Sequence, residues 1–236
     1  MIVNKIIFLR HGESEWNKIN CFTGWYDIPL SEKGQAEAKF AGQVLKQEGW
    51  YFDYAFTSFL KRAIQSLGII LDVLDQSWLP IEKAWQLNER HYGALQGMNK
   101  EEMTNKYGEK KINQWRRGWN YIPPALTDQY EKFSGHDFRY AYLNNFPLTE
   151  SLELTSRRVI AYWKEVIFPR FKLGQSIIIT AHGNSLRALL KYLNYLTAND
   201  IIYVTIPTGI PIVYEFNKYF QPTRYYYLFN DSQLKF

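Results

Sequence analysis

Two histidines occupy matching positions in the sequence, each at the end of a short apolar run and each followed by glycine. Residues 6–9 run into Arg10 and His11, and the isoleucines of residues 177–179 run through a Thr-Ala pair into His182. Short apolar runs of this kind predict strands that are buried on both faces of a sheet. If both strands are parallel and central, their carboxyl ends open on one crevice. The sequence therefore predicts that His11 and His182 face a shared site.

Two histidines in one crevice suit covalent phosphoryl chemistry, because an imidazole nitrogen is a good nucleophile near neutral pH. The transfer also needs positive charge or hydrogen-bond donors around the phosphoryl oxygens. We expect Arg10, Arg62 and the charged form of His182 to supply them, together with the amides of a helix that opens at Asn184. The alternative for Arg62 is an ordinary surface position near the start of a helix.

A carboxylate and two glycines complete this candidate set. Glu89 follows a predicted strand, where a buried carboxyl group can act as a general acid or base; the alternative is a salt bridge to a nearby arginine. Gly12 and Gly183 follow the two histidines, and we expect their lack of a side chain to let a ligand approach the backbone closely.

Other kinds of site are poorly supported by the motifs. The four histidines, His11, His91, His136 and His182, lack zincin spacing, and the single Cys21 provides no thiolate set. A three-histidine zinc site stays open but is less favoured, and a Cys21 nucleophile is less favoured than an inert thiol. The glycine-rich phosphate loops G-x-x-x-x-G-K-[ST] and G-x-G-x-x-G are both absent from the sequence.

The composition is that of a globular chain with an excess of positive charge. It has 236 residues, of which 46% are hydrophobic, and a formal net charge of +5. The charge favours an anionic partner, but no run of five or six basic residues indicates nucleic acid. No apolar run approaches the roughly 20 residues of a membrane span, and no secretion signal begins the chain, so we expect a cytoplasmic location without membrane contact.

Strand-like and helix-like segments alternate along most of the chain. This alternation predicts an α/β fold, a three-layer α/β/α sandwich around a mostly parallel sheet, formed as a single domain over residues 1–236. Residues 93–146 are polar and aromatic, and we interpret them as a helical and loop insertion over the active site. Strands are expected at residues 6–9, 54–57, 81–85, 177–179, 212–216 and 225–229, with helices beginning at Ser31, near residue 60, at Ser151 and at Asn184.

An ordered series of short sequence blocks spans nearly the whole chain. The blocks are RHGESEWN (10–17), FTGWYD (22–27), LSEKG (30–34), TS with LKRA (57–63), LNERHYG (87–93), WRRG (115–118), AHGNSLR (181–187) and IPTG (206–209). Together they resemble the cofactor-dependent phosphoglycerate mutases of the histidine phosphatase superfamily. The triplet RHG alone is weak, whereas the ordered set is very specific.

The resemblance implies a role for each matching residue. His11 would be phosphorylated, His182, Arg10 and Arg62 would stabilise the transferred phosphoryl group, and Glu89 would donate and accept the proton. The substrate's phosphate and carboxylate groups would be held by residues of the same blocks together with Lys100. These residues are Arg10, His11, Gly12, Glu13, Ser14, Glu15, Trp16, Asn17, Thr23, Gly24, Arg62, Glu89, Arg90, His91, Tyr92, Lys100, Arg116, Arg117, Gly183 and Asn184.

The implied reaction interconverts 2-phosphoglycerate and 3-phosphoglycerate, a step of glycolysis and gluconeogenesis. The resemblance implies a phosphohistidine primed by 2,3-bisphosphoglycerate, no metal, small-molecule phosphoglycerates as partners, and a homodimer or homotetramer. It also gives Arg116 and Arg117 a binding role, whereas their charge alone indicates only a solvated helix face.

Three alternatives remain open beside the mutase. Only residues 230–236 follow the last predicted strand, which is short for a family whose C-terminal tail helps to cover the site, so we expect some hydrolysis through the same histidine. A phosphatase or a bisphosphoglycerate synthase is therefore an alternative, although Ser14 stands where similar synthases tend to carry glycine. A binding module without activity is less favoured, because His11, Arg62, Glu89 and His182 are all present.

Overall fold

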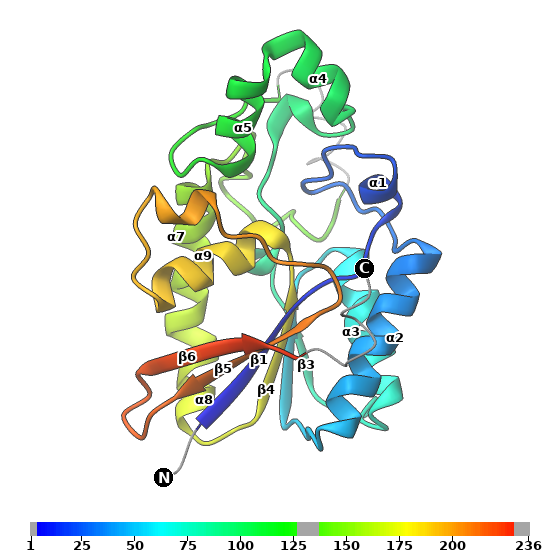
Figure 1. The fold of residues 1–236 in the computed structure, drawn as a ribbon, viewed down its shortest axis with the longest axis vertical. Helices are drawn as coiled ribbons and strands as arrows, with labels where there is room; N and C mark the ends of the chain where they lie inside the picture. Colours follow the sequence, from blue (N-terminus) through cyan, green and yellow to red (C-terminus); the bar gives the residue numbers. More distant parts are fainter. Residues whose placement is uncertain (1–3, 127–136, 229–236) are drawn as a thin grey trace.

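The computed structural model describes residues 4–126 and 137–228, and a six-stranded sheet forms its centre (Figure 1). The strands are β1 (Asn4–Arg10), β2 (Tyr54–Thr57), β3 (Ile81–Lys83), β4 (Ile177–Ala181), β5 (Pro211–Phe216) and β6 (Pro222–Tyr227). Their order across the sheet is β3-β2-β4-β1-β5-β6. The first four in that order run parallel, and β5 runs antiparallel to both of its neighbours. The predicted, mostly parallel sheet is confirmed.

Helices cover both faces of this sheet, which makes the predicted three layers. Helices α2 (Glu32–Gln47) and α3 (Lys61–Val73) lie on one face, and α7 (Leu152–Tyr162), α8 (Phe168–Lys172) and α9 (Gly183–Leu193) lie on the other (Figure 1). Alternate residues of β1 enter the two cores: Ile7 packs with residues of α2 and α3, and Phe8 packs with residues of α7 and α9. Strands buried on both faces must be apolar throughout, which is why the central strands β1 and β4 were visible in the sequence.

Several element boundaries agree closely with the sequence. Ser31 caps α2 as predicted, because its Oγ accepts a hydrogen bond from the Gly34 amide at 3.1 Å. The predicted strand at 54–57 is β2, without change. The strand expected at 81–85 ends at Lys83, and a short 3-10 turn, η1 (Trp85–Leu87), follows it.

The helix predicted to begin at Ser151 runs to Tyr162, where a single π-helical turn, η3 (Trp163–Ile167), interrupts it. This wider turn buries both Trp163 and Ile167 in the core beneath β1 and β4. Pro169, which has no amide hydrogen to continue the helical pattern, follows in the first turn of α8.

The insertion predicted at residues 93–146 is helical and irregular wherever it is described. It contains the 3-10 turn η2 (Gly93–Leu95) and the helices α4 (Lys100–Tyr107) and α5 (Glu109–Arg117), which stand beyond one end of the sheet (Figure 1). Residues 127–136, including His136, lie outside the described residues, as do residues 1–3, the last position of the strand expected at 225–229, and the tail at 230–236. None of the described helices has the length and apolar character needed to cross a membrane.

Candidate active site

The two predicted histidines meet at the carboxyl ends of neighbouring strands. Strands β1 and β4 pair in parallel with Arg10 opposite Ala181, and the amide of His11 extends the ladder by donating to the Ala181 carbonyl at 3.0 Å. His182 then caps the N-terminus of α9. The two imidazole rings lie 4.9 Å apart between centroids, at 61° to each other. Their meeting is a direct consequence of strand register, as the matching positions predicted.

Hydrogen bonds select the nitrogen of His11 that can react. Its Nδ1 lies 2.6 Å from the Gly12 carbonyl oxygen, which only accepts, so Nδ1 carries the proton. Its Nε2 accepts a hydrogen bond from Arg62 Nε at 3.2 Å and therefore keeps a lone pair. Burial, reinforced by Arg62 and Arg10, holds the pKa of His11 well below its usual value. His11 thus presents a neutral, oriented nucleophile at Nε2.

Arg62 is held rigidly beside that nucleophile. It comes from the first turn of α3, is 1% exposed, and donates to the carbonyls of Tyr26 at 2.9 Å and Gly24 at 2.8 Å. Burial lowers its pKa to about 10, which still leaves it charged at neutral pH. Arg10 is placed at the end of β1 by a bond from its Nη1 to the Ile206 carbonyl at 2.7 Å.

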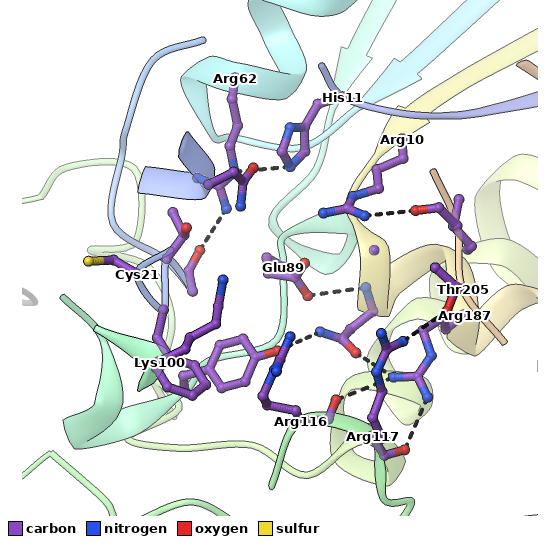
Figure 2. Close-up of a pocket in the computed structure, with 18 residues that line it drawn as sticks. Arg10, His11, Cys21, Arg62, Glu89, Lys100, Arg116, Arg117, Arg187 and Thr205 are labelled. Atoms are coloured by element: carbon purple, nitrogen blue, oxygen red, sulfur yellow. Dashed lines mark hydrogen bonds between the residues drawn. The ribbon is translucent and has the colours of Figure 1, made fainter. Parts of the chain in front are cut away.

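Arg10, His11 and Arg62 line a cavity of about 160 Å³ with a strongly positive wall, and His182 lies behind His11 without lining it (Figure 2). That volume is small beside the roughly 300–1,000 Å³ of pockets for drug-sized ligands. Six of the described lining residues are cationic, and a single one, Glu89, is a carboxylate. The lining is Arg10, His11, Asn17, Cys21, Phe22, Thr23, Gly24, Arg62, Glu89, Tyr92, Lys100, Arg116, Arg117, Gly183, Asn184, Arg187, Thr205 and Ile206.

The cations form two groups. Arg10 and Arg62 lie near His11, whereas Arg116, Arg117 and Arg187 lie together at the opposite side of the pocket in Figure 2. The end of α5 carries Arg116 and Arg117. The arrangement is suited to a small ligand with an anionic group at each end.

Glu89 lies between these two groups in the view of Figure 2. Its Oε1 accepts hydrogen bonds from the amides of Arg90 at 2.7 Å and of Asn184 at 3.2 Å. Asn184 belongs to the first turn of α9, so an amide that we expected to hold a ligand anion instead holds this carboxylate.

The expected charge on His182 is not supported by the structure. The ring is fully buried, and burial, followed by the charge of Arg62, lowers its pKa well below the usual value. His182 is therefore neutral at pH 7 in this state. A neutral imidazole can stabilise an anion only by donating the one proton that it carries.

Seven residues of the predicted binding set lie outside the pocket lining, and their contacts explain why. The Gly12 amide donates to Ser66 Oγ at 3.0 Å, and a side chain at Gly12 would collide with the Gly34 carbonyl, so this glycine serves backbone packing and not ligand approach. Glu13 accepts from Ser31 Oγ at 2.9 Å. Ser14 caps α1 (Glu15–Lys18). The others are Glu15, which is exposed, Trp16, which packs on Tyr26, and Arg90 and His91.

Arg90 and His91 form a layer behind the pocket wall. Arg90 is fully buried and donates to the Tyr92 hydroxyl at 3.0 Å and the Arg116 carbonyl at 2.7 Å. His91 accepts from the Gly93 amide at 3.1 Å and packs between aromatic rings, and burial lowers its pKa to about 4. Both residues are placed to support the wall, without lining the cavity.

The structure adds five lining residues that were absent from the predicted set: Cys21, Phe22, Arg187, Thr205 and Ile206. Arg187 left a signal in the sequence, since it is the one charged residue between Leu186 and Leu190 in a buried helical stripe. Ile206 begins the IPTG block (206–209), whereas Thr205 gave no signal, because it reaches the site only through the path of the chain between α9 and β5. No group of three or more histidine, cysteine, aspartate or glutamate side chains within the described ranges is placed to hold a metal ion.

Comparison with known proteins agrees with this fold. The model of the histidine phosphatase superfamily (branch 1) matches residues 6–135. A mycobacterial glucosyl-3-phosphoglycerate phosphatase is similar in structure, with a TM-score of 0.72 at 20% identity over 95% of this chain and 97% of that chain. An alpha-ribazole phosphatase from Shigella flexneri gives a TM-score of 0.68 at 19% identity over 93% and 94% of the two chains. A phosphoglycerate mutase from Bacillus anthracis gives 0.68 at 24% identity over 94% and 91%.

Proposed function

The chain belongs to the histidine phosphatase superfamily, and on that premise we propose that it interconverts 2-phosphoglycerate and 3-phosphoglycerate through a phosphohistidine at His11. The observation that carries the proposal is the pair of cationic groups on opposite sides of one small cavity. A phosphoglycerate has a phosphate for one group and a carboxylate for the other. The small cavity also favours such a substrate over a phosphate ester with a bulky organic group.

The proposed chemistry begins at His11 Nε2. The Nε2–P bond forms as the bond between phosphorus and the substrate oxygen breaks, and Arg10 and Arg62 balance charge on the phosphoryl oxygens. Glu89 donates a proton to the departing oxygen and recovers one from the hydroxyl that attacks in the return step. Arg116, Arg117 and Lys100 hold the far anionic group while this exchange takes place.

A ligand that carries two phosphates fits this wall. Buried donors in and behind it lack hydrogen-bond partners in the described part of the chain, among them Arg10 Nε, Thr23 Oγ1 and Arg187 Nε. Bound 2,3-bisphosphoglycerate would supply the phosphoryl group that primes His11. The residues of the chain orient that ligand and exclude water from His11, because water at a phosphorylated His11 would give hydrolysis.

Hydrolysis of a phosphomonoester through the same His11 is the second candidate. The names of the compared structures favour it over the mutase, since two of the three are phosphatases. The geometry around His11 serves both reactions equally, because they share the first half. They differ in whether glycerate or water takes the phosphoryl group from His11.

An enolase-coupled assay with a parallel measurement of released phosphate separates the candidates. For a mutase, we expect 3-phosphoglycerate to be converted only after addition of 2,3-bisphosphoglycerate, with little phosphate release and no effect of a chelator. Phosphate release without conversion would establish the phosphatase instead. Net accumulation of 2,3-bisphosphoglycerate would establish a synthase, and conversion without priming that a chelator abolishes would refute the phosphohistidine mechanism.

We also propose a cytoplasmic location and self-association as a homodimer or homotetramer, both from the resemblance of the sequence. Sedimentation of the purified chain measures the second directly. A monomer at micromolar concentration that retains full activity would contradict it.

A further inference from the structure

A buried hydroxyl group lies against His182. Ser58 directly follows β2, is fully buried, and places its Oγ 2.7 Å from His182 Nε2. The same Oγ accepts a hydrogen bond from the Leu60 amide at 3.1 Å. The other ring nitrogen of His182, Nδ1, is also buried and has no partner in the described part of the chain.

The protons in this contact can be assigned by counting donors and acceptors. A neutral imidazole carries one N–H, on either Nε2 or Nδ1. If Nε2 carried it and donated to Ser58, the Ser58 hydroxyl proton would have no acceptor among the described residues, and Nδ1 would be a buried lone pair without a donor. If Ser58 donates to Nε2, both atoms of that contact are satisfied and a single N–H, at Nδ1, is left without a partner.

A proton on His182 Nδ1 is what phosphoryl transfer at His11 requires of this ring. The His182 ring is the immediate neighbour of the His11 ring, at 4.9 Å between centroids. An anionic phosphoryl oxygen accepts from an N–H and is repelled by a bare nitrogen lone pair. The partner that Nδ1 lacks is therefore of the kind that a phosphoryl group on His11 provides.

We propose that Ser58 is a positioning residue, which holds His182 as the Nδ1–H tautomer so that this ring donates to the phosphoryl group transferred at His11. This inference rests on the proposed phosphoryl transfer at His11. Two neighbouring imidazoles then have opposite tautomer requirements, because the Gly12 carbonyl leaves His11 Nε2 bare to attack while Ser58 leaves His182 Nδ1 protonated to donate.

The adjacent Thr57 provides a matched control. It is equally buried, and its hydroxyl donates to the Thr180 carbonyl at 2.8 Å within the sheet and not to His182. Ser58→Ala and Thr57→Val each remove one buried hydroxyl group, and the two positions are adjacent in the chain. Only Ser58→Ala removes a hydrogen bond to the His182 imidazole.

The first test is direct and needs no variant of Ser58. Nitrogen-15 NMR of the histidine-labelled wild-type protein, with His182 assigned from a His182→Asn variant, distinguishes a protonated from a bare ring nitrogen. We expect Nδ1 protonated and Nε2 bare at pH 7.5. The opposite tautomer, or a charged ring, would overturn the proposal whatever the enzyme's reaction proves to be.

The second test measures the functional consequence. We expect Ser58→Ala to lower the rate of phosphohistidine formation about 10²-fold, the size of effect seen when one preorganised donor is removed, with a small change in KM. Ser58→Thr, which keeps the hydroxyl, should recover most of the rate, and Thr57→Val should stay near wild type. Equal losses in Ser58→Ala and Thr57→Val would reduce the role of Ser58 to packing. If the wild-type protein formed no phosphohistidine with any donor, the proposed function would fail while the NMR result still stood.

Discussion

Glu89 is the residue to which the proposed reaction assigns proton transfer, because it is the one carboxylate among the described residues of the pocket lining. The amides of Arg90 and Asn184 fix its Oε1. A glutamine can accept from the same two amides, so its substitution removes the titratable proton while preserving the local hydrogen bonds.

Glu89→Gln is therefore expected to lower turnover of phosphoglycerate about 10²–10⁴-fold. Phosphohistidine formation from p-nitrophenyl phosphate should fall much less, because p-nitrophenolate departs without needing a proton. Stopped-flow rates with the two donors measure the difference. Glu215→Gln, which changes a buried carboxylate on β5 that pairs with Lys5 and Arg224, is the control. Equal losses with both donors would mean that Glu89 acts on binding and not on proton transfer.

At the scale of elements, the cations of the far wall depend on how the end of α5 is held. The last carbonyl groups of a helix have no hydrogen-bond donors within the helix. At the end of α5, two buried arginines donate to them. Arg90 donates to the Arg116 carbonyl at 2.7 Å, and Arg187 donates to the Arg117 carbonyl at 3.0 Å and the Ile201 carbonyl at 2.6 Å. Arg187 thus connects α9, the end of α5 and the 3-10 turn η4 (Asp200–Ile202).

Arg187→Met should release this end of α5. Hydrogen bonds from a charged group contribute about 1.5–3 kcal/mol each, so we expect KM for phosphoglycerate to rise tenfold or more. KM for p-nitrophenyl phosphate, whose far end is neutral, should change little. Lys191→Met, one turn further along α9, is the control, since its ammonium group bonds the Leu196 carbonyl outside the pocket. A similar rise for both substrates would indicate a general loss of structure.

The elements also show what the sequence could and could not predict. Helix α2 and strands β2 and β4 were placed within a few residues because local features define them: an N-cap serine and apolar runs. The shared crevice followed from two strands with matching ends. Thr205 was missed because its contact with Arg117 joins positions 88 residues apart.

Two residues of the motifs that were expected near the ligand lie outside the pocket lining. His91 is a histidine beside Glu89, yet it packs between aromatic rings behind the wall. Gly12 is beside His11, yet the Gly34 backbone requires its lack of a side chain. Sequence motifs indicate which residues lie near a site. Which of them face the cavity depends on how segments distant in the sequence pack against them.

The whole molecule contains at least three histidines whose protonation opposes folding. Burial lowers the pKa of His11, His182 and His91, the last to about 4. In the unfolded chain a histidine binds a proton below about pH 6.5, whereas these folded residues resist it. Because the unfolded state then holds more protons, stability is fully present above pH 6.5 and is lost as the pH falls.

Urea unfolding between pH 7.5 and 5 should show this loss, with a slope of up to about 4 kcal/mol per pH unit if all three histidines contribute. His91→Gln removes one of the three without touching the pocket lining, so its slope should be about one third smaller. A free energy of unfolding that stays constant over this range would contradict the buried, neutral state of these rings.

The charges of the pocket also affect the stability of the whole molecule. Burial lowers the pKa values of Arg10, Arg62, Lys100, Arg117 and Arg187, those of Arg62 and Arg187 to about 10 and about 9. Neighbouring arginines add to this effect at Lys100, Arg117 and Arg187, which means that the positive charges of the far wall repel one another in the folded chain. An anion that fills the cavity relieves this repulsion, so a dianionic ligand should stabilise the fold by more than its contacts at one end would provide.

Thermal unfolding with 2,3-bisphosphoglycerate tests this argument. A ligand at 100 times its dissociation constant adds about 2.7 kcal/mol, which for a chain of this size raises Tm by roughly 5–10 °C. Inorganic phosphate at the same concentration and ionic strength should raise Tm less, because it engages one cationic group at a time. In an Arg116→Ala, Arg117→Ala double variant the two ligands should become nearly equal. If they raise the wild-type Tm equally, the two groups of cations do not act on one ligand, and the proposal of a substrate with two anionic ends loses its support.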